Sequence, residues 1–149
     1  AAASGMNPNT MNLVSAERAA ELYGLIGPAT EMSGGSAGNT MACFASFGGK
    51  GAYIGKVAND QLGTIFAHDT RAIGVHFESS PLVDGKPTAQ CLILVTPDAQ
   101  RTMNTFLGAC TQLTEDDVER TKIEVEKKMK EAGEKLEALF TKKETEITS

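Results

Sequence analysis

The sequence predicts an α/β fold in which a parallel layer, a group of antiparallel strands and a long C-terminal helix follow one another. Residues 29–74 alternate between extended and helical patterns, which is typical of a parallel layer. Short runs rich in Thr, Val, Ile and Phe follow Gly74, and such runs are typical of a meander. Residues 122–149 hold 7 lysines and 7 glutamates with one glycine and no proline, which predicts a long helix.

The composition indicates a folded globular chain and excludes several function classes. The chain has 149 residues, of which 41% are hydrophobic and 22% charged, so wholesale disorder is not expected. No run approaches the roughly 20 apolar residues that a membrane helix needs, so we expect no membrane partner. The net charge of −5 argues against a nucleic-acid partner, because such proteins hold phosphates with excess basic residues.

The cysteines and the first residues predict a cytoplasmic protein. Cys43, Cys91 and Cys110 are odd in number and widely spaced, and no CxxC motif indicates a zinc site or a disulfide framework. We therefore expect buried, reduced thiols and no metal site. The opening AAASGMNPNT has neither a basic nor an apolar region, so no secretory signal is expected.

A first helix is predicted over residues 15–24. Ser15 is a suitable N-cap, and Ala19, Leu22 and Tyr23 are expected to form its apolar face. Gly24 ends the pattern.

The parallel layer is predicted from residues 29–74. After an extended stretch at 29–32, a helix is expected over 36–47, with small residues that allow close packing against a sheet. A buried strand is expected over 52–57, and Asn59 or Asp60 is expected to cap a third helix that runs to Ala72.

Three β-prone runs follow. They cover residues 75–78, 88–95 and 101–107, with turn residues between them. We expect them to form an antiparallel meander beside the parallel layer.

The last helix is predicted to begin after Thr114, with Asp117 as its capping-box partner. Apolar residues then recur at spacings of mostly three and four, as in an amphipathic helix or a coiled-coil strand: Val118, Val125, Met129, Ala132, Leu136 and Leu139 or Phe140. The change in composition predicts two domains, residues 1–121 and residues 122–149.

The segment Ser33–Asn39, SGGSAGN, is the most informative motif. Glycines before a helix let a ligand approach the backbone, and the helix start offers free N–H groups. The glycine spacing is not that of a GxGxxG dinucleotide motif. A ligand site and a plain tight turn both remain open from these residues alone.

Two longer stretches together resemble a known family. SGGSAGNTMACFASFGGKGAYIGKVANDQLGTIFAHDTRAIGV and PTAQCLILVTPDAQRTMNTFLGA resemble the ribokinase-like (phosphofructokinase-B type) sugar and nucleoside kinases, in particular the adenosine-kinase-like branch. The resemblance runs from about Asn12 to Asp117. It implies part of a ribokinase-like α/β layer with a small antiparallel β lid that closes over a sugar or nucleoside.

The resemblance also implies site residues. Gly34 and Gly35 match the family's di-glycine at the hinge between lid and core, and Asn39 matches the Asn that binds substrate hydroxyls. Arg101 falls where adenosine-kinase-like members carry a lid arginine near the transferred phosphate. Lid side chains such as Gln90 are candidates to face the substrate.

Two departures from the family pattern limit the implied activity. No first strand with a sugar-binding Asp precedes Asn12, and no D-T-x-G-A-G-D-like segment supplies an anion hole and a catalytic base. We therefore expect a truncated, substrate-binding segment of an ATP-dependent kinase that is inactive alone, with no catalytic residue. ATP and Mg²⁺ are implied for the complete family enzyme, and no cofactor is expected on this chain alone.

The alternative is a non-catalytic module that associates with itself or a partner through the lid strands and the tail helix. Under either hypothesis exposed apolar faces need burial, so a homo-oligomer is expected.

Overall fold

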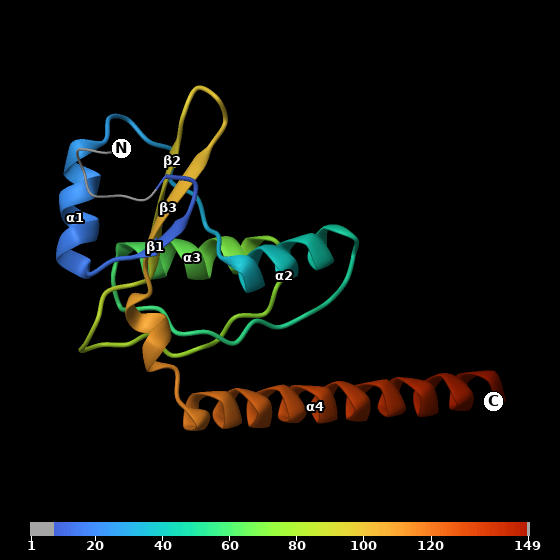
Figure 1. Cartoon of the computed structure of the whole chain (residues 1–149). Helices are drawn as coiled ribbons and strands as arrows, with labels where there is room; N and C mark the ends of the chain where they lie inside the picture. The colour runs from blue at the N-terminus through green and yellow to red at the C-terminus, as the bar shows by residue number, and fades with distance from the viewer. Residues whose placement is uncertain (1–7, 149) are drawn as a thin grey trace. The chain divides into compact units, whose positions relative to one another are not determined.

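A computed structural model describes residues 8–148 of the chain (Figure 1). Most of the opening segment, from which we expect no secretory signal, lies outside the described residues. The chain divides into two compact units, one ending at Leu113 and one beginning at Thr114, and each is described by itself. The predicted domain boundary near residue 121 stays a prediction.

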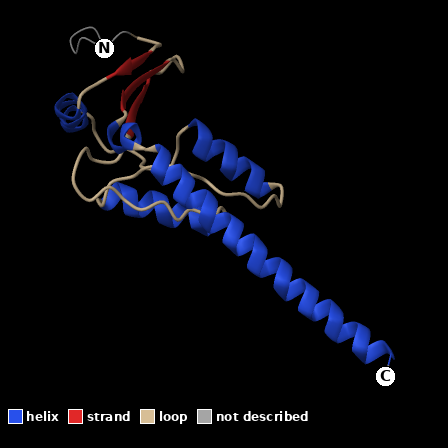
Figure 2. Ribbon diagram, turned by 90° about the horizontal axis from the view of Figure 1, so that it is seen from below, coloured by secondary structure: helices blue, strands red, loops and turns tan. Residues whose placement is uncertain are grey.

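The first unit contains a three-stranded sheet in the order β1-β3-β2 (Figure 2). Strands β2 (Gln90–Val95) and β3 (Arg101–Phe106) pair antiparallel, which confirms the hairpin expected from the two runs. Strand β1 (Met11–Leu13) pairs parallel with β3 and was not predicted. Its three residues are too few to show an alternating pattern.

Helix α1 (Ala16–Leu25) is confirmed and covers the sheet. The Ser15 hydroxyl accepts a hydrogen bond from the Arg18 N–H at 3.2 Å, as an N-cap should. Ala19 and Leu22 are buried against β2 and β3. The expectation for Tyr23 is wrong, because its ring is half exposed and its hydroxyl donates to Glu31.

Helix α3 (Gln61–Ala72) begins where the sequence predicts, with Asp60 as its N-cap. Two residues of an extended segment after α3, Val75 and Phe77, are almost fully buried. The Phe77 ring lies 5.6 Å from that of Phe66 and 5.7 Å from that of Tyr53, centroid to centroid. Aromatic packing of this kind holds α3 against the extended segments.

The prediction of a continuous strand over residues 52–57 is wrong. The chain makes only isolated parallel bridges with the segment after α3, Ala52 to His76 and Ala58 to Leu82. Between the bridges the Gly55 N–H donates to the Ser79 hydroxyl instead of to a carbonyl group, which interrupts the ladder. The segment 75–78 therefore pairs parallel with this region, and its expected place in the antiparallel meander is also wrong.

Helix α2 (Ser36–Ser46) is confirmed, but its expected packing against a sheet is wrong. None of its residues is buried. Its apolar side chains lie instead over the glycines that follow it, since a Cβ on Gly49 would overlap the Phe44 ring and one on Gly51 would overlap the Met41 methyl group.

The 3-10 helix η2 (Gly108–Gln112) ends the first unit, and helix α4 (Glu115–Thr148) forms the second. The capping box is confirmed: the Asp117 N–H donates to the Thr114 hydroxyl at 3.2 Å, and the Thr114 N–H donates to the Asp117 carboxylate at 3.1 Å. No helix in the described part of the chain has both the length and the apolar character to cross a bilayer.

The three cysteines are free and exposed, so the expectation of buried thiols is wrong. Cys91 is exposed because side chains alternate along β2. Its neighbours Gln90 and Leu92 are half-buried on one face of the sheet, so Cys91 points to the other face.

Candidate functional site

The two faces of the sheet differ sharply. Along β3, Thr102, Asn104 and Phe106 are buried, and this face lies against α1. The alternate residues point the other way. The side chains on this other face, which we call the open face, are Arg101, Met103 and Thr105 of β3, Cys91, Ile93 and Val95 of β2, and Met11 and Leu13 of β1.

The open face is an apolar platform. Met103 pairs with Ile93 on one side and with Met11 on the other, so three apolar side chains lie in one row across the sheet. The five large apolar residues of this face are 36% to 65% exposed. Apolar side chains side by side on a sheet are suited to bind a flat, apolar ligand group.

Arg101 places a cation at the turn end of the open face. It pairs with Val95, and the turn between the strands is closed by a hydrogen bond from the Thr96 N–H to the Gln100 carbonyl group at 3.0 Å. Ala99 adopts a left-handed φ of 62° in this turn. The Arg101 side chain is exposed and makes no ion pair within residues 8–148, so it is available to an anionic group.

Gln90 lies on the opposite face from Arg101. It pairs with Phe106 at the base of the hairpin and is half-buried on the side that α1 covers. A ligand lying against one face of the sheet can therefore contact Gln90 or Arg101, but not both.

The start of α2 forms a second group of polar atoms. Gly35 caps this helix with a φ of 91°, a conformation that favours glycine. The Asn39 N–H donates to the Gly35 carbonyl group at 2.8 Å, while the Asn39 side chain is exposed. A Cβ on Gly34 or Gly35 would meet nothing within 4 Å, so a ligand has room to approach this backbone. The three N–H groups before Asn39 have no partner within the helix.

The structure therefore brings Gly34, Gly35 and Asn39 together and places Arg101 on the sheet. Both groups belong to the unit that ends at Leu113. No hydrogen bond among residues 8–148 joins the Asn39 side chain to Arg101 or Gln90. The open face itself was missed from the sequence, although the alternation of β2, once paired with β3, would have located it.

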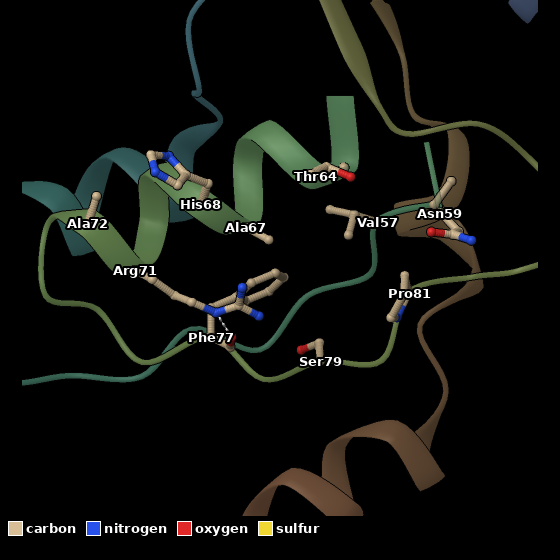
Figure 3. Close-up of a pocket in the computed structure, with 12 residues that line it drawn as sticks. Val57, Asn59, Thr64, Ala67, His68, Arg71, Ala72, Phe77, Ser79 and Pro81 are labelled. Carbon is tan, nitrogen blue, oxygen red and sulfur yellow. Dashed lines mark hydrogen bonds between the residues drawn. The ribbon is translucent and has the colours of Figure 1, made fainter. Parts of the chain in front are cut away.

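A cavity of about 530 Å³ lies elsewhere, between α3 and the extended segments beside it (Figure 3). Small apolar side chains such as Val57, Ala67 and Pro81 form much of its wall. The Arg71 Nε–H donates to the Phe77 carbonyl group at 2.9 Å, and the Glu78 carboxylate lies 3.9 Å from the same nitrogen. None of the predicted site residues lines this cavity, which is part of the packing of α3.

Within residues 8–148 no three side chains among His, Cys, Asp and Glu lie close enough to hold a metal ion together.

Comparisons with known proteins agree with the sequence resemblance. The family model described as pfkB family carbohydrate kinase matches residues 9–133. The solved adenosine kinase from Sinorhizobium meliloti is 56% identical, with a TM-score of 0.72, and the match covers 78% of this chain and 37% of that one. A probable sugar kinase from Rhizobium etli is 53% identical over the same shares, also with a TM-score of 0.72.

More distant structures share the fold. Anopheles gambiae adenosine kinase, in complex with P1,P4-di(adenosine-5) tetraphosphate, is 23% identical with a TM-score of 0.69 over 76% of this chain. No curated protein matches the chain. The chain spans little more than a third, 37%, of the two bacterial structures, so the activity of a whole enzyme does not transfer to it directly.

Proposed function

The chain belongs to the pfkB family of carbohydrate kinases, and on that premise we propose that it binds the alcohol substrate of an ATP-dependent kinase. The substrate class that fits best is a nucleoside. The two similar bacterial structures are an adenosine kinase and a probable sugar kinase, so their names alone do not choose between the two classes.

The observation that carries the proposal is the apolar open face. A nucleoside has a flat base and a hydroxyl-bearing ribose, whereas a free sugar has hydroxyls on all sides. The row formed by Ile93, Met103 and Met11 suits the base, because apolar surface is removed from water on both partners. A sugar would gain little from the same surface.

We expect polar groups near the start of α2 to bind the ribose of the nucleoside. The exposed Asn39 amide has a carbonyl oxygen and an NH₂ group, so it can both accept from and donate to ribose hydroxyls. The open space over Gly34 and Gly35 admits the ribose beside it. Arg101, at the end of the open face, is suited to stabilise the charge of a phosphoryl group during transfer.

ATP with Mg²⁺ supplies the phosphoryl group in the complete family enzyme, and we assign no residue of this chain to hold either. The printed sequence contains no glycine-rich anion hole and no base of the family type. These 149 residues by themselves are therefore expected to bind substrate without transferring phosphate. The exposed, unpaired thiols fit a reducing compartment, so we propose a cytoplasmic location.

Calorimetry with adenosine and with ribose tests the proposal. We expect adenosine to bind more tightly than ribose, and Asn39→Ala to weaken adenosine binding about tenfold through loss of its hydrogen bonds. Gln90→Ala is the matched control, since it shortens a polar side chain on the covered face and should leave the affinity unchanged. Equal affinity for ribose and adenosine, or no binding of adenosine, would contradict the assignment.

A coupled assay for ADP, with ATP, Mg²⁺ and adenosine, tests the expected inactivity. We expect no turnover above the rate without protein. Steady ADP production that rises with protein concentration would show that the chain is a kinase by itself.

A second candidate function, self-association, is favoured by the apolar residues of α4. Met129, Leu136 and Leu139 are all more than 60% exposed and recur at helical spacing. Sedimentation velocity at micromolar concentration should show a homo-oligomer, and Leu136→Glu should yield monomers. A monomeric wild-type chain would rule this candidate out.

A further inference from the structure

The C-terminal part of α4 carries an apolar stripe that is open to solvent. From residue 129 on, five large apolar side chains are each more than 60% exposed: Met129, Leu136, Leu139, Phe140 and Ile147. In a helix with 3.6 residues per turn, they fall within roughly a third of the circumference. Since α4 has 34 residues and a helix gains most of its stability by packing such a stripe, this face is suited to a partner.

Two rows of opposite charge border the stripe. The basic row lies along one side and consists of three exposed lysines, spaced seven residues apart: Lys128, Lys135 and Lys142. The acidic row lies along the other side and consists of three exposed glutamates: Glu126, Glu137 and Glu144. Each glutamate is two residues from a lysine of the basic row, so the two rows run at matching heights along α4.

One charged residue, Lys143, lies inside the stripe. Its ammonium group lies 2.8 Å from the Glu146 carboxylate, which is one turn further along the helix. The charge is thus paired within α4, and the carbon stem of the side chain can cover apolar surface. A single charged residue in an apolar seam lowers the stability of the assembly but limits the number of helices that can pack together.

We propose that residues 129–147 of α4 dock on the same segment of a second copy of the chain, parallel and in register. This inference rests on the proposed self-association and adds the orientation. In a parallel pair the two-fold axis runs along the helices, so the basic row of each copy faces the acidic row of the other. In an antiparallel pair each row would face its own counterpart, with lysines against lysines and glutamates against glutamates. The charges therefore favour the parallel pair.

Charge reversal at position 135 separates the two orientations by the sign of its effect. In the parallel pair Lys135→Glu places a glutamate against the acidic row in each copy, and we expect the dissociation constant of the dimer to rise about tenfold. In an antiparallel pair the same substitution would relieve repulsion between the basic rows and tighten association. Sedimentation velocity of the full chain at low ionic strength, where surface charges are least screened, measures the change.

Two further variants show whether the effect belongs to the pairing of the rows. Adding Glu137→Lys to Lys135→Glu restores opposite charges at the same height, so the affinity of the wild-type chain should return. Lys127→Glu is the matched control, because it makes the same change in net charge on the side of α4 opposite the stripe. Its dissociation constant should stay within about twofold of the wild-type value.

Carbodiimide cross-linking of the wild-type chain tests the register. The reagent joins a lysine amine directly to a carboxyl group that touches it, and mixing ¹⁴N- and ¹⁵N-labelled chains identifies links between copies by mass spectrometry. We expect links between copies at matched heights, such as Lys135 to Glu137. Links between opposite ends of the segment, such as Lys128 to Glu146, would overturn the parallel pairing.

The outcomes separate the orientation from the self-association. A dimer that Lys135→Glu tightens or leaves unchanged would overturn the parallel pairing of the rows, while self-association would stand. A wild-type chain that is monomeric at micromolar concentration would overturn self-association, and the pairing with it. Neither result bears on the binding of a nucleoside by the first unit.

Discussion

The two faces of the small sheet are built from the same strands but differ in how far their side chains are buried. On the covered face, Asn104 and Phe106 are buried beneath α1, where Ala19 and Leu22 complete the packing. On the open face, apolar side chains such as Ile93 and Val95 remain in contact with solvent. Apolar character alone therefore does not distinguish the buried face from the exposed face, since β2 carries apolar side chains on both sides.

The largest change in the free energy of unfolding is expected for a substitution on the covered face. Phe106→Ala removes a ring that is 7% exposed, and we expect the free energy of unfolding to fall by about 3–5 kcal/mol. Ile93→Ala, in the same sheet but 52% exposed, should cost less than about 1 kcal/mol, because its side chain loses little buried contact. Urea unfolding followed by circular dichroism measures both. Equal losses would show that the open face is part of the core.

Sequence patterns predicted the helices well and the sheet only in part. Ser15, Asp60 and Thr114 locate three helix starts because a cap is a local interaction within a few residues. The short strand β1 could not be predicted, since it depends on pairing with β3 about 90 residues later in the chain. The segment 52–57 is apolar like a strand, but its partner makes only isolated bridges with it.

The sequence predicted individual residues of the candidate site but not the open face of the sheet. The motif that contains Gly35 and Asn39 is contiguous, so its resemblance to the family could be seen directly. The separation of Gln90 from Arg101 needed the register of β2 against β3, because a shift by one residue would exchange the faces.

The next largest change in the free energy of unfolding is expected at the base of the hairpin formed by β2 and β3. Asp60→Ala removes the cap of α3 and the partner of Thr88, and we expect a loss of about 2 kcal/mol at neutral pH. Partial burial raises the pKa of Asp60, but hydrogen bonds from Thr88 and from the Gly63 N–H outweigh it and lower the pKa below its ordinary value. A lowered pKa means that this stabilisation is present above the ordinary carboxyl pKa and is lost as the pH falls through the folded-state value.

The direction of the Asp60 pKa shift can be checked by measuring unfolding at a series of pH values between 7 and about 2. This range includes the ordinary Asp pKa of about 3.9. The difference in stability between the wild-type chain and Asp60→Ala should be constant near neutrality and should shrink in acid. A difference that grows on acidification would contradict the direction of the shift.

A smaller effect is expected within the covered face itself. The Asn104 Oδ1 atom is buried without a hydrogen-bond partner in the described structure, and its NH₂ group makes only a long contact of 3.5 Å to the Leu92 carbonyl group. Replacing a poorly satisfied polar group with an apolar one of similar size can stabilise. We expect Asn104→Leu to raise the free energy of unfolding by about 1 kcal/mol. A large loss in urea unfolding would mean that Asn104 is properly satisfied.

The smallest change in stability is expected for Arg101. Its exposed side chain has no partner in the described part of the chain, so Arg101→Ala should change the free energy of unfolding by less than about 0.5 kcal/mol. The same variant should weaken binding of AMP relative to adenosine, because only AMP carries an anionic group for the guanidinium. Calorimetry with both ligands makes the comparison, and an equal loss for both would place Arg101 away from the phosphate.

The division between the two faces can be tested most directly by nuclear magnetic resonance of chain labelled with ¹³C at the methionine methyl groups. Met103 and Met11 lie on the open face, whereas Met129 lies on α4 in the second unit. On titration with adenosine, we expect saturable shifts of the Met103 and Met11 signals and none for Met129. Unchanged Met103 and Met11 signals at saturating adenosine would contradict the assignment of the open face as the nucleoside-binding surface.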